Sequence, residues 1–166
     1  GKADYARTKG EAEAAVREAF ATATILRPST VFGREDQFIN RFAGMIARLP
    51  VVPVLRSGAR FQPVYVGDAA NAVVAGLSEP ARFGGHTFEL GGPRAWTFRE
   101  LLAFILKETR RERRLVNIPT GLAALQARLA ELLPDPPLTR DQLLLLQRDN
   151  VPDPAMPGLA ELGITP

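Results

Sequence analysis

Two residues near the start of the chain have types and a spacing that could support proton-transfer chemistry. Tyr5 and Lys9 lie four residues apart in the stretch DYARTK. On a helix, this spacing puts both side chains on one face, one turn apart. A nearby ammonium group lowers the pKa of a phenol because it stabilises the phenolate. Such a tyrosine can exchange a proton with an alcohol or a carbonyl near neutral pH, and the lysine can donate hydrogen bonds to sugar hydroxyls. The four-residue pattern alone also occurs in many helices that have no catalytic function.

The elements around this pair are predicted to alternate between helix and strand. The alanine-rich stretch 3–20 predicts a helix, and Thr24, Ile25 and Leu26 predict a short strand that stops at Pro28. A helix followed so closely by a strand is typical of the second half of a βαβ unit. Later elements follow from capping and turn signals, with Asp36 and Asp68 as helix N-caps. The predicted set is a helix over 37–48, an extended piece within 49–60, an edge strand over 61–66, a helix over 69–78, a strand over 86–90, a capping box at 97–100 that opens a helix to about 109, a strand over 115–119, helices over 120–133 and 139–148, and a surface tail over 151–166.

Composition excludes several functional classes. The chain has no cysteine and one histidine, His86, so it offers neither a thiol nucleophile nor a two-histidine metal site. His86 and Trp96 are predicted to have surface and packing roles, respectively. No apolar run approaches the roughly 20 residues that a membrane-spanning helix needs, and the start of the chain does not resemble a secretory signal. The high arginine content is typical of a GC-rich bacterial genome. We therefore expect a soluble cytoplasmic protein, either free or peripheral at the inner membrane.

Four ordered motifs carry a family resemblance. Tyr5–Lys9 is followed by ILRPSTVFG (25–33), VYVGDAANAV (64–73) and FELGGPRAWTFRE (88–100). In this order the motifs resemble the extended short-chain dehydrogenase/reductase family, whose members are NAD(P)-dependent oxidoreductases and epimerases. FQPVYVGDAA (61–70) and PPLTRDQLLLLQRDNV (136–151) are most similar to the branch that contains the nucleotide-binding accessory subunit of respiratory complex I and its bacterial homologues.

The resemblance assigns roles to individual residues. It implies that Tyr5 reaches the nicotinamide ribose and any reacting carbonyl, and that Lys9 holds the ribose hydroxyls. The loop that lines the nicotinamide, largely through backbone groups, would be formed by Pro28, Ser29, Thr30 and Val31. Arg60 and Gln62 are expected on the substrate side, and Arg27 in a structural ion pair. Phe61 stands where many sugar-nucleotide enzymes have a phosphate-binding arginine, which argues against a phosphorylated sugar as substrate.

Part of the family pattern is absent from these 166 residues. There is no G-x-x-G-x-x-G turn, which binds the pyrophosphate of the dinucleotide through backbone amides and a helix N-terminus. In the family this turn precedes the tyrosine helix, so we expect the chain to be the C-terminal part of a longer protein that binds NADP or NAD. The fold expected is α/β, the C-terminal part of a Rossmann-like parallel sheet with a small substrate-side cap. We expect one partial domain over 1–166, in which 1–48 complete the nucleotide-binding unit and 49–166 form mostly the cap. Without the preceding strands, apolar helix faces should be exposed.

The sequence is compatible with three functions. The first is a dinucleotide-binding accessory protein of a respiratory complex, inactive in the form of these 166 residues alone. The second is an active NAD(P)-dependent oxidoreductase or epimerase. The third is an interaction module whose basic run KETRRERR (107–114) contacts anionic lipid, nucleic acid or another subunit. The alternative for this run is a solvated helix end and turn. Of the three partners, nucleic acid is not expected, and exposed apolar surface could make the chain a homo-oligomer.

Overall fold

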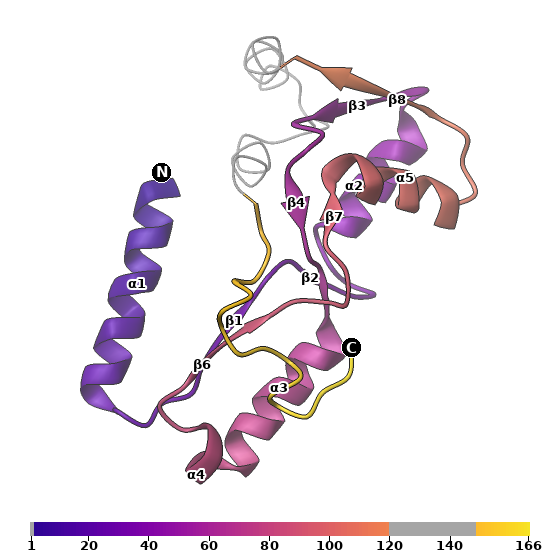
Figure 1. Ribbon diagram of the computed structural model, residues 1–166. Helices are drawn as coiled ribbons and strands as arrows, with labels where there is room; N and C mark the ends of the chain where they lie inside the picture. The colour runs from indigo at the N-terminus through magenta and orange to yellow at the C-terminus, as the bar shows by residue number, and fades with distance from the viewer. Residues whose placement is uncertain (1, 120–148) are drawn as a thin grey trace. The chain divides into compact units, whose positions relative to one another are not determined.

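A computed structural model describes residues 2–119 and 149–166, with side chains from residue 7 onward (Figure 1). The helices predicted over 120–133 and 139–148 lie outside the described residues. The elements, in chain order, are α1 Lys2–Ala19, β1 Ile25–Pro28, β2 Val31–Phe32, α2 Ile39–Arg48, β3 Val51–Leu55, β4 Arg60–Phe61, β5 Val64–Tyr65, α3 Val66–Ser78, α4 Pro80–Phe83, β6 Thr87–Leu90, β7 Trp96–Thr97, α5 Phe98–Glu108 and β8 Arg114–Ile118.

The described strands form pairs, and most of these pairs are parallel. β1 pairs with β6, β2 with β5 and β3 with β8 in parallel, whereas β4 and β7 are antiparallel. Parallel strands joined through helices are the arrangement expected of an α/β protein. The predicted fold class is therefore confirmed.

The contacts divide the chain into two compact units that interleave in the sequence. The first unit takes up residues 1–33, 63–93 and 152–166, and the second takes up 34–62 and 94–151. Neither unit is a continuous segment. The one-domain organisation divided at residue 48 stays a prediction.

The first unit is built around β1 and β6. The two strands run in register from Ile25↔Thr87 to Pro28↔Leu90, and α3 packs on β1, β2 and β5. Its buried core consists of Val64, Ala72, Phe83, Phe88, Leu90, Leu159 and Leu162. The prediction that residues 151–166 only lie over the surface is therefore wrong. Leu159 and Leu162 come three residues apart within a turn and fill the core of this unit.

The second unit has an aromatic core. Helices α2 and α5 pack against each other and, through Val52 and Val54, against the β3–β8 pair. The ring of Phe98 lies 5.1 Å from that of Phe42 and 6.0 Å from that of Phe61, measured between centroids. Offset and edge-to-face rings at such distances stabilise a core beyond their buried area.

Local capping fixes where the second unit's helices begin. Thr97 and Glu100 form the predicted capping box, in which the Thr97 hydroxyl accepts from the Glu100 amide and the Glu100 carboxylate accepts from the Thr97 amide. The Asp36 carboxylate accepts from the amides of Phe38, at 2.8 Å, and Ile39, at 2.5 Å. Asp36 therefore satisfies free amides at the start of α2, as its residue type predicts, although the N-cap position itself is occupied by Phe38 and not by Asp36.

Two predictions for the central segment are wrong. The expected strand over 61–66 is divided at Pro63, which has no amide proton to donate to a ladder. As a result, β4 and β5 belong to different units and pair with different partners. Asp68 is not an N-cap, because α3 already begins at Val66 and Asp68 lies in its first turn. There the carboxylate is favoured by the helix dipole.

Candidate functional site

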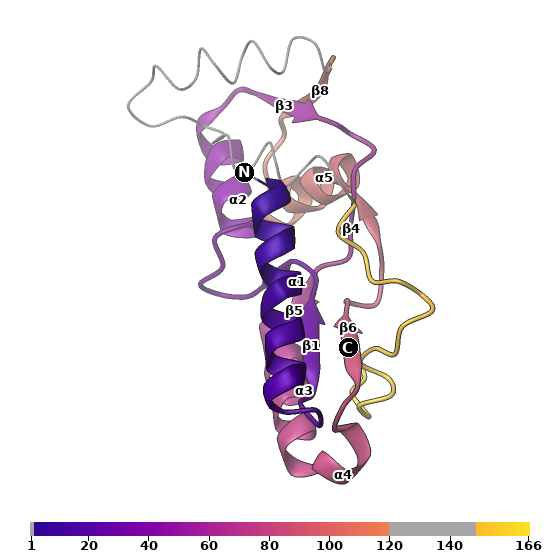
Figure 2. The same ribbon diagram turned by 90° about the vertical axis from the view of Figure 1, so that its left-hand side faces the viewer.

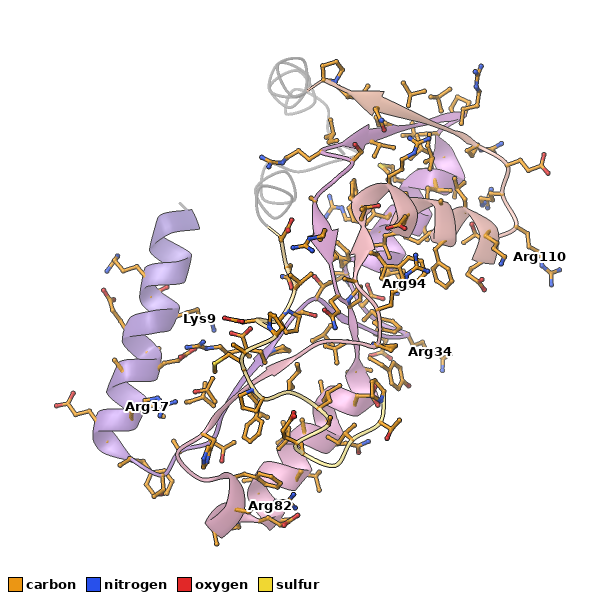
Figure 3. The ribbon with its side chains drawn as sticks, in the orientation of Figure 1. Lys9, Arg17, Arg34, Arg82, Arg94 and Arg110 are labelled. Atoms are coloured by element: carbon orange, nitrogen blue, oxygen red, sulfur yellow. The ribbon has the colours of Figure 1, made fainter. Side chains whose placement is uncertain are left out.

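Helix α1 carries the tyrosine–lysine pair. Alanine and glutamate favour the helix, and Arg7 and Glu11 form an ion pair of 2.7 Å one turn apart on its exposed surface. Tyr5 and Lys9 both lie within α1, so the helical repeat puts the two positions on one face, one turn apart. Lys9 is exposed, and Figure 3 shows it projecting from the side of α1 that faces β1 and β6.

Arg27 ties α1 to the end of the β1–β6 pair. Its guanidinium donates to the Glu13 carboxylate at 2.6 Å and 3.0 Å, and to the Glu89 carboxylate at 3.4 Å. Glu89 in turn accepts from the Asp153 amide at 2.8 Å. The prediction that Arg27 takes part in a structural ion pair is confirmed. Helix, both strands and the C-terminal segment are thus joined through Arg27 and its two carboxylates, which we call the Arg27 clamp.

The clamp changes the pKa values of its members. The hydrogen bond from Arg27 lowers the pKa of the Glu13 carboxyl, and burial opposes this only in part. The same bond raises the pKa of Arg27, with a smaller contribution from Glu89. Both groups therefore stay charged across the physiological range. The side chains of Arg27 and Glu13 are 46% and 26% exposed, so solvent screening keeps the clamp's contribution to stability modest.

Arg17 provides a second anchor near the other end of α1. Its guanidinium donates to the Gly85 carbonyl at 3.1 Å and to the Thr87 hydroxyl. Figure 3 shows Arg17 on the same side of the helix as Lys9. Two arginines, one from the helix and one from β1, thus fix how α1 lies along the strands. Arg17, Glu13 and Glu89 were not predicted from the sequence. One signal could have indicated that a single face of α1 makes these contacts: polar residues recur on it every four positions, at Tyr5, Lys9 and Glu13.

The predicted cofactor loop lies where β1 and β6 end. The parallel strands finish side by side at Pro28 and Leu90. The Ser29 amide donates to the Leu90 carbonyl at 2.8 Å, and the Val64 amide donates to the Thr30 carbonyl at 3.0 Å. Val31 then pairs with Val64 at the start of β2. The loop 28–31 is thus fixed by backbone bonds on both sides, at the edge where open α/β sheets bind their ligands.

Gly92 lets another segment approach this edge closely. It follows β6 by two residues, and a Cβ atom at this position would lie 2.1 Å from the Pro63 carbonyl oxygen. Only glycine fits such an approach. The glycine in the ELGGP turn is therefore required for packing at this edge, independently of any ligand.

The N-terminal turns of α1 extend past this edge. Glu13 lies level with Arg27, the third residue of β1. Since α1 runs opposite to β1, earlier helix residues lie beyond the strand ends (Figures 1 and 2). With a rise of about 1.5 Å per residue, Lys9 lies about 6 Å and Tyr5 about 12 Å farther along the axis than Glu13. The positions of the pair and the loop 28–31 thus both lie at the end of the first unit where β1 and β6 finish.

Arg60 and Gln62 belong to the second unit. Arg60 donates through Nε to the Asp149 carboxylate at 2.8 Å, and its amide donates to the same carboxylate at 2.9 Å. These bonds lower the pKa of Asp149, the backbone bond having the largest effect. The Gln62 amide donates to the Asn150 carbonyl at 3.0 Å. The substrate-side roles of both residues stay predictions.

His86 and Trp96 have surroundings that agree with their predicted surface and packing roles. His86 is exposed and its Nδ1 lies 3.0 Å from the Gly84 carbonyl oxygen. Trp96 packs on Phe104, with 5.1 Å between ring centroids, and carries the Arg94 guanidinium 4.1 Å above its ring.

Exposed apolar residues gather on α3, as predicted. Val73 is 50% exposed, Val74 60% and Leu77 76%. Beside them lies a groove of about 250 Å³ lined by Phe20, Thr22, Thr24, Leu26, Val73, Gly76, Leu77 and Pro80. All of these residues belong to the first unit.

No metal or membrane-spanning element is found in the part of the chain that the structure describes. No group of three or more histidine, aspartate or glutamate side chains there could hold a metal ion. None of the described helices combines the length and hydropathy needed to cross a bilayer.

The chain belongs to the NAD-dependent epimerase/dehydratase family, whose model matches residues 2–91, more than half of the chain. This match includes α1, the loop 28–31 and both strands of the β1–β6 pair. The family assignment thus covers the part of the first unit that carries Tyr5, Lys9 and the loop 28–31.

The curated relatives share a more particular identity. The mitochondrial protein named NADH dehydrogenase (ubiquinone) 1 alpha subcomplex subunit 9 of Arabidopsis thaliana is 38% identical over 122 residues, covering 73% of this chain and 30% of that protein. The mouse protein of the same name is 34% identical over 163 residues, covering 96% of this chain and 43% of that protein. The chain therefore spans less than half the length of these relatives. The predicted relationship to the complex I subunit is confirmed.

Solved structures agree on the fold. A crystal structure of UDP-glucose-4-epimerase from Stenotrophomonas maltophila, with bound NAD and formylated UDP-arabinopyranose, superposes with a TM-score of 0.58 at 20% identity. The superposition covers 69% of this chain and 42% of that chain. At this identity the likeness concerns the fold alone.

Proposed function

We propose that this chain contributes the nicotinamide-ribose side of a NAD(P)(H)-binding site in a protein related to the complex I accessory subunit. The observation that supports it most is the edge where β1 and β6 end. There the loop 28–31 is held by backbone bonds. The Arg27 clamp holds α1 so that Lys9, four residues before Glu13 on the helix, lies past the strand ends.

The residues present fit one end of a dinucleotide. An exposed lysine suits ribose hydroxyls because its ammonium has three donors and no acceptor. Ser29 and Thr30 are half-buried, and their backbone bonds to Leu90 and Val64 fix this stretch at the strand ends, where a flat ring could lie against it. The pyrophosphate has no cradle here, because the 166 residues contain no glycine-rich turn of the family's spacing. The glycine-rich part would thus have to come from residues outside these 166.

Each site residue has a separate task in this proposal. The bound nicotinamide would supply hydride chemistry. Lys9 would donate to the ribose hydroxyls and hold a positive charge beside Tyr5, which favours the phenolate and so makes the Tyr5 hydroxyl a better proton donor and acceptor. Pro28, Ser29, Thr30 and Val31 would exclude water from one face of the ring. Arg60 and Gln62 would take substrate-side roles.

A place beside the respiratory chain is part of the proposal. The names of the relatives assign them to a mitochondrial NADH dehydrogenase (ubiquinone). We propose that the protein that carries this chain likewise associates with a respiratory complex, as a peripheral protein of the membrane that houses it.

A second candidate is an active NAD(P)-dependent oxidoreductase or epimerase. The observation that favours it is that Tyr5 and Lys9 are both present at helical spacing within α1. A purely structural subunit would not need this pair. In this case Tyr5→Phe should abolish turnover and leave cofactor binding intact, whereas an accessory subunit has no turnover to lose.

Calorimetric titration with NADH and NADPH tests the proposal. A protein that joins this chain to a glycine-rich strand–turn–helix segment should bind one of them, and the 166 residues alone should bind far more weakly. Lys9→Met should weaken binding to the longer protein by about 10- to 100-fold, the range for hydrogen bonds from a charged donor. Arg7→Met is the control, because Arg7 is exposed on the same helix and pairs with Glu11. Equal effects of the two substitutions, or tight binding to the 166 residues alone, would refute the proposal.

A further inference from the structure

The C-terminal end of α5 holds an arginine where glycine is the usual residue. The Arg111 amide donates to the Leu106 carbonyl at 2.9 Å, and the Arg110 amide donates to the Lys107 carbonyl at 3.0 Å. These two bonds form a Schellman motif, whose turning residue adopts a left-handed conformation. That residue is Arg110, with φ of 51°. A side chain at this φ is strained, so the position would be more stable with glycine.

Arg110 is part of a basic segment that forms no ion pair with the residues that the structure describes. The run 107–114 contains five cations, Lys107, Arg110, Arg111, Arg113 and Arg114, and two carboxylates, Glu108 and Glu112. All of these residues are exposed. Among the residues that the structure describes, none of the five cations forms a salt bridge with a carboxylate. Figure 3 shows Arg110 pointing away from the end of α5 into solvent.

An apolar sheet face adjoins this segment. β3 and β8 are parallel, with Val51 opposite Arg114 and Pro53 opposite Val116. Val52 and Val54 are fully buried against α2 and α5, so alternation turns Val51, Pro53, Arg114 and Val116 to the other face. Val51 is 44% exposed and Val116 43% exposed. Val51 thus lies beside Arg114, where the basic run enters β8, and Val116 lies two residues farther along the same face.

We propose that this surface, Lys107–Arg114 together with Val51 and Val116, binds the headgroup region of an anionic phospholipid membrane. Basic residues attract the lipid phosphates, and the valines beside them can enter the membrane–water interface. The electrostatic and the apolar contribution thus both strengthen binding to the membrane. Long arginine side chains reach the phosphates while their methylene groups stay among apolar surroundings. Nucleic acid fits less well, because the run 107–118 contains no aromatic residue on which a base could stack. A need for the charge of Arg110 in membrane binding would explain why an arginine stands at this strained left-handed position.

Vesicle cosedimentation with the 166-residue chain tests the proposal. The chain should bind vesicles of phosphatidylglycerol and phosphatidylcholine in equal parts, should not bind pure phosphatidylcholine, and should be released as salt rises above about 0.15 M. Replacement of Arg110, Arg111, Arg113 and Arg114 by glutamine should abolish binding. Val51→Ser with Val116→Ser should weaken it, whereas the exposed Val73→Ser in the first unit should not.

Arg110→Gly separates binding from folding. It should raise the melting temperature by about 2–4 °C, since it relieves the left-handed strain, and weaken vesicle binding about fivefold, the effect of one charge near the surface. Arg56→Gly is a matched control, because Arg56 also has a left-handed φ, of 48°, and lies at the far end of β3. It should stabilise the chain and leave vesicle binding unchanged.

Three outcomes would overturn the proposal. The first is no binding of the unchanged chain to the anionic vesicles. The second is an equal loss of binding in Arg56→Gly and Arg110→Gly. The third is complete displacement from the vesicles by low concentrations of polyglutamate or duplex DNA, which would identify an acidic protein or a nucleic acid as the better ligand.

Discussion

The two units differ in what holds them together. The second unit closes around phenylalanine rings and buried valines. The first unit has a smaller buried core. At the edge where β1 and β6 end it relies on the half-exposed Arg27 clamp, while α3 leaves valines and a leucine exposed. Aromatic burial contributes several kcal/mol per residue, whereas exposed ion pairs contribute about 1 kcal/mol or less. We infer that the second unit is the more stable and that the candidate site lies on the part that opens more easily.

Removal of one central ring should have the largest effect. Phe98 is 1% exposed and contacts two other rings, so Phe98→Ala should lower the free energy of unfolding by about 3–5 kcal/mol. Denaturant unfolding, followed by hydrogen exchange of each unit's amides, measures this. The control is Phe104→Ala, since Phe104 is 43% exposed. Faster exchange confined to the first unit would contradict the comparison.

Gly92→Ala should have an intermediate effect, centred on the first unit. A Cβ atom would approach the Pro63 carbonyl oxygen to 2.1 Å, so the backbone must move, at a cost of about 1–3 kcal/mol. The same substitution at Gly58, where a Cβ atom would meet nothing within 4 Å, is the control. Thermal unfolding of both variants gives the difference in their melting temperatures. Equal melting temperatures would show that the backbone at Gly92 can shift at little cost.

Loss of the clamp should have the smallest effect on stability, and it should depend on pH. The pKa of Glu13 is lowered in the folded chain, so its contribution is present above the unfolded-state pKa of about 4.3. The contribution is lost as the pH falls through the lower folded-state value. Glu13→Gln should therefore destabilise the chain at neutral pH by no more than about 1 kcal/mol, and the difference from the unchanged chain should vanish in acid.

Glu11→Gln, which removes the exposed Arg7 partner, is the control for the clamp. Denaturant titrations at neutral and acidic pH compare the two variants with the unchanged chain. A Glu13→Gln effect that stays constant down to the lowest pH would exclude an ionised pair as its cause.

Local signals were sufficient to predict some of the fold. The capping box of Thr97 and Glu100 and the helix that carries Tyr5 and Lys9 depend on neighbours within four residues, and both predictions are confirmed. Asp68 was predicted wrongly because β5 passes into α3 without a loop, so the helix starts two residues before the carboxylate.

Non-local arrangements could not be predicted from single segments. Nothing near Pro63 indicates that the strands on either side of it belong to different units. Glu13 and Glu89 meet on Arg27 only because β1 pairs with a strand far along the chain. The loop 28–31 was found through its motif. The bonds that hold it involve Leu90 and Val64, which no periodicity connects to it.

The burial of Leu159 and Leu162 sets an order in which the first unit can form during synthesis. The two leucines complete the core around β1 and β6, yet they are made well after the helix with Tyr5 and Lys9 and after every residue of the second unit. A nascent chain that does not yet include Leu159 should therefore have an unfinished β1–β6 edge that is open to chaperones and proteases.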